Sequence, residues 1–206
     1  MSASKKFAAA YSNTRSIYER KAVQFDHDRD RRLYEKSWLD RFLAHIPEQG
    51  RILDVGCGTG EPISRYLIER GFELSGIDYS EAMIEIVSHR FPDQAWHHMD
   101  MRNLRFEQRF DGIVAWHSFF HLNQSDQLKT IALFSAHLNP SGALLFTAGP
   151  DAGETTGHVA GREVYHSSLS QQQYAAAFKK NGMELLDWAH EDPECYFDSI
   201  YLAKKL

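Results

Sequence analysis

One short segment of the chain places an acidic residue just before three alternate glycines, a pattern that could hold a small ligand. The run from Ile52 to Pro62 reads I-L-D-V-G-C-G-T-G-E-P, so an apolar strand carrying Asp54 leads into a turn with glycine at every second position. Glycine lets the backbone approach a ligand where a Cβ atom would collide with it. In a doubly wound α/β fold, such a turn builds a ligand site at the carboxyl end of the first strand.

The spacing of these glycines favours one class of ligand over another. A dinucleotide fingerprint reads G-x-G-x-x-G and holds a pyrophosphate at the N-terminus of the next helix. Here the pattern is D-x-G-x-G-x-G, and the next helix begins with Glu61 and Pro62, which suit a phosphate poorly. The run closely resembles the first motif of class I S-adenosylmethionine (SAM)-dependent methyltransferases, whose cofactor is a zwitterion without phosphate.

Two further acids follow the next predicted strands. Asp78 lies eighteen residues after Gly60, close to the roughly 20-residue spacing at which an acid binds a ribose diol in related folds. A carboxylate suits that role because it accepts hydrogen bonds from both hydroxyls. Asp100 follows the third predicted strand. The resemblance implies that this acid accepts a hydrogen bond from the adenine amine, and that the amide of Met101 donates to the adenine ring.

The resemblance implies a full set of cofactor contacts, although each residue has a second interpretation. Asp54 could cap the following loop, Asp78 could be the N-cap of the helix that begins near Ser80, and Cys57 could be only a small residue in a tight turn. The implied SAM contacts, shared by the product S-adenosylhomocysteine (SAH), are Tyr18, Asp54, Gly56, Cys57, Gly58, Gly60, Asp78, Tyr79, Met83, Asp100, Met101, Trp116 and His117.

Two histidines after the fourth predicted strand are candidates for proton transfer. Methyl transfer is an in-line displacement, and it needs a general base only when the acceptor arrives protonated. His117 and His121, in W-H-S-F-F-H, would lie near the methyl group, and the usual histidine pKa of about 6.5 suits a base at neutral pH. The alternative is that they only hold a loop by hydrogen bonds. Their spacing also matches a metal-binding pair, but nothing nearby in the sequence offers a third ligand, so we expect no metal.

A glycine-rich polar stretch over 149–168 is predicted to be a loop that covers the substrate, because long structureless loops in compact domains are usually functional or disordered. The alternative is a short hairpin over 157–165 that only shields the sheet edge. The candidate substrate contacts in this stretch are His158, Arg162, Tyr165 and His166.

The elements that must position these residues alternate between strand and helix. Candidate strands cover 51–55, 73–77, 95–98, 110–116, 142–148, 183–190 and 196–203, and candidate helices cover 62–70, 80–90, 125–137 and 170–180. Such alternation predicts a parallel sheet covered on both faces. The last two strands flank E-D-P-E with no helix between them, so they should be antiparallel. The predicted fold is α/β, with a doubly wound, seven-stranded, mostly parallel Rossmann-like sheet whose last strand is antiparallel.

We expect one domain over residues 1–206. Its parts would be a helical N-terminal cap over 1–46, a SAM-binding half over 47–148, and a final part over 149–206 with the lid loop, the last helix and the terminal hairpin. At 206 residues and 43% hydrophobic content, the chain can bury a sizeable core.

The composition of the chain limits the kinds of molecule that it could bind. The formal charge of −5 argues against a nucleic-acid surface, which is normally basic. No apolar stretch approaches the roughly 20 residues that span a bilayer. Two distant cysteines, Cys57 and Cys195, suggest a reducing cytoplasmic compartment. We expect a monomer or homodimer that methylates a small molecule. The alternatives are a non-catalytic SAM- or SAH-binding protein and another nucleotide-dependent enzyme on the same scaffold.

Overall fold

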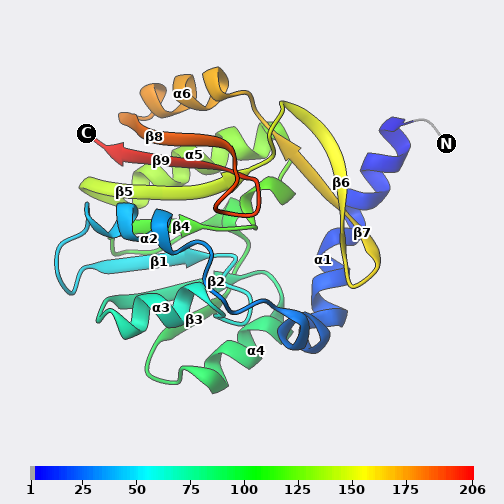
Figure 1. The fold of residues 1–206 in the computed structure, drawn as a ribbon, viewed down its shortest axis with the longest axis horizontal. Helices are drawn as coiled ribbons and strands as arrows, with labels where there is room; N and C mark the ends of the chain where they lie inside the picture. Colours follow the sequence, from blue (N-terminus) through cyan, green and yellow to red (C-terminus); the bar gives the residue numbers. More distant parts are fainter. Residues whose placement is uncertain (1–2) are drawn as a thin grey trace.

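A seven-stranded sheet forms the centre of the molecule (Figure 1). The computed structural model describes the backbone of residues 3–206 and side chains from residue 7 onward. The strand order is β3-β2-β1-β4-β5-β9-β8, and β9 runs antiparallel to both of its neighbours while the other adjacent pairs are parallel. This confirms the predicted fold class. The strands are β1 (Arg51–Val55), β2 (Glu73–Asp78), β3 (Ala95–His98), β4 (Phe110–Ala115), β5 (Leu138–Ala148), β8 (Met183–Asp192) and β9 (Asp198–Lys205).

The strand order creates a crevice beside β1. The chain passes from β1 outward to β2 and β3, and then crosses back to place β4 on the other side of β1. The connections after β1 and β4 therefore leave the sheet in opposite directions. In open α/β sheets, ligands bind outside the carboxyl ends of the strands at such a reversal.

Helices cover both faces of the sheet, because most strand residues are apolar on both sides. Within β5, Leu144 packs into one apolar cluster with α5 and α6, while its neighbour Leu145 packs into the other with α2 and α3. Alternate side chains of a strand point to opposite faces, so a fully covered strand reads as a continuous apolar run. The helices are α2 (Lys36–Leu43), α3 (Ile63–Glu69), α4 (Glu81–Arg90), α5 (Gln124–His137) and α6 (Gln171–Lys180), with short 3-10 turns η1 (Met101–Asn103) and η2 (Phe119–His121).

The segment over 149–168 is an ordered hairpin, so the prediction of a structureless lid loop is wrong. Strands β6 (Gly153–Val159) and β7 (Arg162–Ser168) pair along their whole length. Their turn residues Ala160 and Gly161 both have positive φ, at 46° and 73°, as a two-residue hairpin turn requires. The hairpin is longer than the alternative over 157–165. Rather than shielding the sheet edge alone, it lies against the first helix (Figure 1).

The N-terminal cap consists of one long helix and one short one. Helix α1 (Ala3–Asp28) lies at the end of the sheet toward which β1 and β4 point, beside the β6–β7 hairpin (Figure 1). Helix α2 instead packs on the sheet through Trp38, Leu39, Phe42 and Leu43. The two helices of the cap therefore have different positions, one over the carboxyl ends of the strands and one on a face of the sheet.

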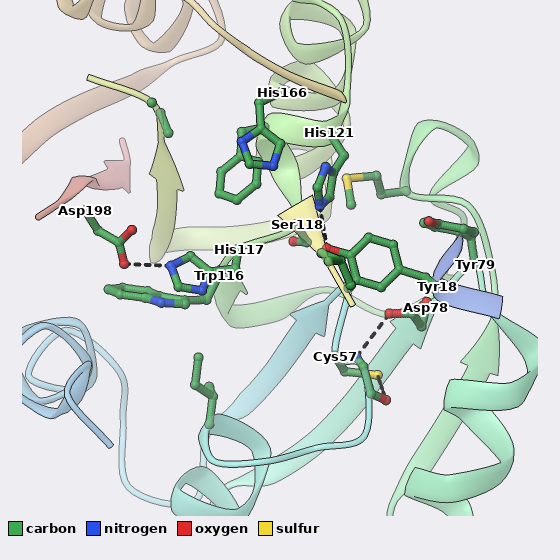
Figure 2. Close-up of a pocket in the computed structure, with 18 of the residues that line it drawn as sticks. Tyr18, Cys57, Asp78, Tyr79, Trp116, His117, Ser118, His121, His166 and Asp198 are labelled. Atoms are coloured by element: carbon green, nitrogen blue, oxygen red, sulfur yellow. Dashed lines mark hydrogen bonds and ion pairs between the residues drawn. The ribbon is translucent and has the colours of Figure 1, made fainter. Parts of the chain in front are cut away.

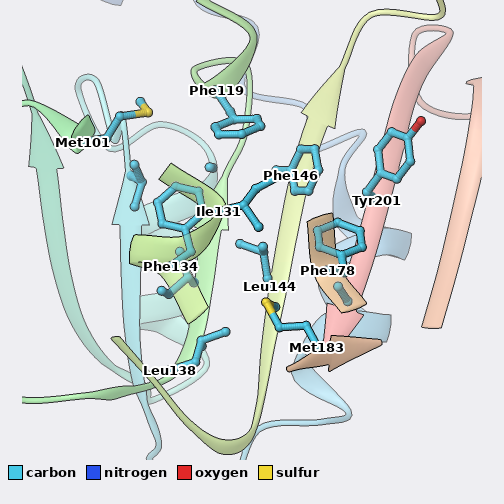
Figure 3. Packing of buried hydrophobic residues seen from close by; sticks show 14 of the residues in the cluster. Met101, Phe119, Ile131, Phe134, Leu138, Leu144, Phe146, Phe178, Met183 and Tyr201 are labelled. Carbon is cyan, nitrogen blue, oxygen red and sulfur yellow. The ribbon is translucent and has the colours of Figure 1, made fainter. Parts of the chain in front are cut away.

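An aromatic pair joins β5 to the antiparallel strand β9 in the core (Figure 3). Phe146 stacks on Tyr201 with ring centroids 5.2 Å apart and an interplanar angle of 11°, and the two residues are partners in the strand register. Phe146 is completely buried and also contacts Phe119 and Phe178.

We expect Phe146→Ala to lower the free energy of unfolding by about 3–5 kcal/mol, because it removes buried surface and leaves a cavity between β5 and β9. Urea denaturation of the purified variant measures this change. Leu206→Ala is the matched control, since Leu206 is 70% exposed, and it should change the free energy by less than about 0.5 kcal/mol. A loss below about 1 kcal/mol for Phe146→Ala would contradict this packing.

Candidate active site

A cavity occupies the crevice at the carboxyl ends of β1, β2 and β4 (Figure 2). Its volume is about 710 Å³, within the roughly 300–1,000 Å³ range of small-molecule sites. Helix α1 and the β6–β7 hairpin contribute residues to the side that the sheet leaves open. The cavity is therefore enclosed by segments from both ends of the chain.

The glycine turn after β1 forms part of the cavity wall and touches the end of β4. Gly56 and Gly60 have φ values of 75° and 82°, a conformation that other residues rarely adopt. A Cβ atom on Gly56 would lie 2.3 Å from Cβ of Ser118, and one on Gly60 would lie 2.8 Å from the ring of Phe91. Ser118 Oγ donates a hydrogen bond of 2.6 Å to the carbonyl of Val55. The glycines thus permit the close approach of β1 and β4 that shapes the site.

Two buried carboxyl groups lie in the cavity wall without a close cation. Asp78 accepts hydrogen bonds from the backbone amides of Gly58 (3.0 Å) and Ser80 (2.8 Å). Asp54 accepts one from Ser64 Oγ at 2.6 Å. Burial raises the pKa of Asp54 to about 7 and that of Asp78 to about 6. Both carboxyls have unused acceptor capacity on the cavity side, which a ligand cation or hydroxyl could use.

The N-cap interpretation of Asp78 is wrong, because Ser80 performs that role. Ser80 Oγ accepts the hydrogen bond from the amide of Met83 at the start of α4. Asp78 instead links the glycine turn after β1 to the segment before α4, because its carboxylate accepts one amide hydrogen bond from each.

Helix α1 is fastened over the cavity by its last turn. Arg90 of α4 forms two hydrogen bonds to the carboxylate of Asp26, at 2.7 and 2.8 Å, and a third to the carbonyl of Thr59 at 2.7 Å. Just beyond the helix, Arg29 lines the cavity and its Nε donates to the carbonyl of Glu61 at 3.3 Å. The guanidinium of Arg29 also opposes the rise in the pKa of Asp54. The Nη2 atom of Arg29 also donates to the buried carboxylate of Glu35 at 3.5 Å, so a ligand anion in the cavity would share this guanidinium with Glu35.

His121 is held between two hydrogen-bond partners. Its Nδ1 lies 2.8 Å from the carbonyl of Tyr165, which can only accept, so Nδ1 carries the proton. Its Nε2 then accepts the hydrogen bond from the hydroxyl of Tyr18 at 2.9 Å. Burial lowers the pKa of His121 to about 3. Since both nitrogens are engaged and the ring stays neutral, the geometry favours the alternative that His121 only positions its neighbours.

His117 has a different environment from His121 (Figure 2). Its φ is 49°, its amide donates to Thr147 Oγ1 at 2.8 Å, and its Nε2 lies 2.6 Å from Oδ2 of Asp198. Both residues line the cavity. Asp198 was not predicted from the sequence, because it comes from the first residue of β9, far from the motifs around β1 to β4.

The comparisons with known proteins identify the family. The family described as "Methyltransferase domain" matches residues 25–202. The chain belongs to this methyltransferase family. This confirms the resemblance to the class I SAM-dependent enzymes.

Several relatives of this methyltransferase domain carry methyltransferase names. A putative methyltransferase, YqeM, of Bacillus subtilis is 36% identical over 63% of this chain and 54% of its own length. A dTDP-3-amino-3,4,6-trideoxy-alpha-D-glucopyranose N,N-dimethyltransferase of Streptomyces venezuelae is 32% identical over 52% of this chain and 45% of its own length. The chain thus matches about half the length of these curated relatives.

Solved structures share the fold of this methyltransferase domain. SAM-bound CalS10, an amino pentose methyltransferase from Micromonospora echinaspora, superimposes with a TM-score of 0.68 over 90% of this chain and 96% of its own, at 21% identity. A SAM-dependent methyltransferase from Clostridium acetobutylicum gives 0.70 over 95% and 98%, at 16% identity. None of the helices in residues 3–206 has the length and hydrophobicity needed to cross a bilayer.

Most of the predicted site residues of the methyltransferase domain line this cavity, but three do not. Asp100 is paired with Arg102 at 2.6 Å beside the cavity. Arg162 is exposed next to the hairpin turn, and the hydroxyl of the buried Tyr165 donates to Glu154 at 2.6 Å. The predicted residues that line the cavity are Tyr18, Asp54, Gly56, Cys57, Gly58, Gly60, Asp78, Tyr79, Met83, Met101, Trp116, His117, His121, His158 and His166.

Several lining residues could not be found from sequence motifs. Arg29 belongs to the run R-D-R-R, which is typical of a solvated charged segment.

The predicted residue Trp116 has a free donor. Its indole Nε1 is buried with no hydrogen-bond partner among the described residues, so it can donate to a ligand. Within the same part of the chain, no group of three or more His, Cys, Asp or Glu side chains is arranged to hold a metal ion.

We expect Asp54 and Asp78 to destabilise the ligand-free fold progressively as pH rises from about 4 to about 7, while the lowered pKa values of His121 and His166 act in the opposite direction over the same range. A carboxyl whose pKa is raised by folding contributes stability below its unfolded pKa, near 4, and this contribution disappears as pH rises through the folded pKa. With folded pKa values of about 7 for Asp54 and about 6 for Asp78, the loss should be about 2–4 kcal/mol for each group.

Urea denaturation at pH 4.5 and pH 8 tests this pH dependence. Asp54→Asn should remove the loss of stability that Asp54 contributes between the two pH values, because the neutral amide does not titrate, so its free energy of unfolding should change more favourably from pH 4.5 to pH 8 than that of the wild type. Asp93→Asn, at an exposed position outside the cavity, should leave the difference unchanged. An equal pH dependence in wild type and Asp54→Asn would contradict the assigned pKa of Asp54.

Proposed function

We propose that this chain binds SAM in the cavity at the carboxyl ends of β1, β2 and β4 and transfers the methyl group to a small-molecule acceptor. The observation that carries the proposal is the pair of buried carboxyls, Asp54 and Asp78, beside the glycine turn in a cavity of about 710 Å³. Carboxyls deprived of water need hydrogen-bond donors or cations, and SAM offers a ribose diol and an ammonium.

The lining residues suit the separate parts of the cofactor. Asp78 would accept from the ribose hydroxyls, and Asp54 would face the ammonium group. Arg29, the one guanidinium among the described lining residues, would balance the carboxylate. Tyr79, Met83 and Met101 offer apolar surface for the adenine, and the unpartnered Trp116 Nε1 offers a donor.

The chain's own contribution to the reaction is binding, alignment and exclusion of water. When bound, SAM supplies the methyl group, whose bond to the sulfonium sulfur breaks with its electron pair on sulfur as the acceptor's lone pair forms the new bond. The ion pair between Asp26 and Arg90 keeps α1 over the cavity, and the hairpin residues His158 and His166 line it from β6 and β7. Holding two reactants in line inside a closed site lowers the entropic part of the barrier.

A small acceptor is supported by the charge of the chain and by its relatives. The net charge of −5 does not suit a nucleic acid, and the relative from Streptomyces venezuelae named above is an amino-sugar N,N-dimethyltransferase. Both cysteines are buried and free, so we also propose a reducing, cytoplasmic compartment. The chain would act as a monomer or homodimer.

We expect isothermal titration of the purified protein to give saturable one-site binding of both SAM and SAH. Asp78→Asn should weaken SAM binding by about 1.5–3 kcal/mol, roughly 10- to 100-fold, because it removes a charge-assisted acceptor. Asp93→Asn is the control with the same chemical change at an exposed site, and it should bind SAM like the wild type.

The same titration distinguishes the alternatives. No binding of SAM or SAH, together with binding of NADH, would overturn the proposal in favour of another nucleotide-dependent enzyme. Binding of both ligands without release of SAH from SAM over a broad set of acceptors would indicate a non-catalytic binding protein.

A further inference from the structure

We propose that His117 accepts the proton of the methyl acceptor through its Nδ1, that Asp198 is the residue that positions it, and that the acceptor therefore carries a hydroxyl or a protonated amine. This inference rests on the proposed methyl transfer and extends it to the class of acceptor. A thioether acceptor has no proton to lose and would need no such pair next to the reacting atoms.

The contact between His117 and Asp198 determines which ring nitrogen is free. The carboxylate oxygen Oδ2 lies 2.6 Å from Nε2 and can only accept, so Nε2 carries the proton of the neutral ring. Nδ1 then presents its lone pair, and among the described residues no group forms a hydrogen bond to it. The carboxylate thus holds the tautomer that a general base needs, and it can stabilise the imidazolium that forms.

The backbone on both sides of this pair adopts a conformation that side chains rarely permit. His117 has a φ of 49°, and Tyr196 and Phe197, which precede Asp198, have φ values of 53° and 58°. Such residues cost free energy and persist where the surrounding structure holds them. The amide of His117 is held by Thr147 Oγ1 at 2.8 Å, which fixes one side of the pair.

The β8–β9 turn that carries Asp198 is held from outside the sheet. The hydroxyl of Tyr196 donates to Asp30 at 2.8 Å, and the indole of Trp38 donates to Asp192 at 2.7 Å. Asp30 and Trp38 belong to the connection after α1 and to α2. The same N-terminal region that closes the cavity therefore also holds the turn with the carboxylate that faces His117.

The other two histidines near His117 are less suited to take a proton. His121 has both nitrogens engaged, and burial lowers its pKa to about 3. Burial also lowers the pKa of His166, to about 4, and no carboxylate is paired with its ring. Among the described groups that interact with His117, Asp198 from β9 lies 2.6 Å from its ring, whereas His121 from η2 and His166 from β7 carry no negative charge, so Asp198 is the one of these three that can stabilise a positive charge.

The proton balance of the reaction follows from this arrangement. For a hydroxyl acceptor, the O–H bond breaks and its proton bonds to Nδ1 of His117 as an oxygen lone pair forms the bond to the methyl carbon. For a protonated amine, the N–H proton bonds to Nδ1 first, and the electron pair left on nitrogen then forms the bond to the methyl carbon. The resulting imidazolium is neutralised by the carboxylate of Asp198. Because the side chain of His117 is 32% exposed, the ring can then pass the proton to water.

Nitrogen-15 NMR of histidine-labelled protein tests the tautomer without an acceptor. The His117 signals, identified by their loss in His117→Gln, should show the Nε2–H tautomer in the wild type at pH 8. Asp198→Asn should shift the ring toward the Nδ1–H tautomer, because the carboxylate that selects Nε2–H is gone. Asp28→Asn is the control, since Asp28 pairs with His27 at 2.8 Å on the exposed end of α1; it should leave the His117 signals unchanged.

Turnover tests the catalytic part of the proposal. SAH release is followed over a panel of small alcohols, phenols and amines, and SAM affinity is measured for each variant by titration. Because His117 and Asp198 line the cavity, kcat is measured at a SAM concentration that saturates each variant, so that a change in SAM affinity does not enter the comparison. With an acceptor that is turned over, His117→Gln should lower kcat by about 10²- to 10⁴-fold and Asp198→Asn by about tenfold or more, whereas Asp28→Asn should not.

SAM binding and kcat together distinguish a failure of this inference from a failure of the proposed function. If the wild type does not bind SAM, the proposed function fails. If SAM binds and His117→Gln keeps the wild-type kcat, or loses only acceptor KM, the base role of His117 is refuted and methyl transfer stands. A His117 ring in the Nδ1–H tautomer, or one that Asp198→Asn does not change, refutes the role of Asp198 even before any acceptor is found.

Discussion

The removal of two carboxyl groups from water, at the ends of adjacent strands, is the constraint on which the site depends. Burial raises the pKa values of Asp54 and Asp78 to about 7 and about 6, and their hydrogen bonds from an alcohol and two backbone amides oppose this rise only in part. A folded protein keeps such groups only where something else compensates their cost. In this chain the hydrogen bonds to Asp78 also fix the glycine turn and the start of α4. The burial of Asp78 therefore costs free energy and at the same time determines the shape of the cavity.

The closure of the cavity depends on a different kind of interaction. Arg90 binds Asp26 through two hydrogen bonds and the carbonyl of Thr59 through a third, so one guanidinium joins α4, the glycine turn and the end of α1. Its charge lowers the pKa of Asp26 to about 2. A half-buried bidentate pair holds geometry better than an exposed one. The long helix α1 packs mainly on the β6–β7 hairpin and α4, so this fastening at its last turn determines how it covers the site.

The sequence was sufficient to predict the sheet, the glycine turn and Asp78, because these depend on local sequence patterns. The strands over 51–55 and 95–98 were predicted with the observed bounds, and the glycine turn and Asp78 follow strand ends that periodicity reveals. The hairpin over 153–168 was anticipated only as a shorter alternative over 157–165, since its largely polar strands carry no clear apolar alternation and it packs against α1, which the sequence does not reveal. Arg29 and Asp198 were missed for a related reason. Each reaches the cavity through tertiary packing, and neither lies in a motif that spacing alone can identify.

The two predicted histidines show that residue type alone does not determine which imidazole can accept a proton. Both follow β4 by a few residues, and both point toward the same cavity (Figure 2). Tyr18 and the carbonyl of Tyr165 occupy both nitrogens of His121, whereas Asp198 occupies one nitrogen of His117. A carbonyl and a phenol leave a ring neutral and fixed, while a carboxylate leaves one nitrogen with a lone pair and stabilises the protonated form. The chemistry of an imidazole is therefore decided by partners that come from distant segments, here β7, β9 and α1, and only the folded chain brings those partners together.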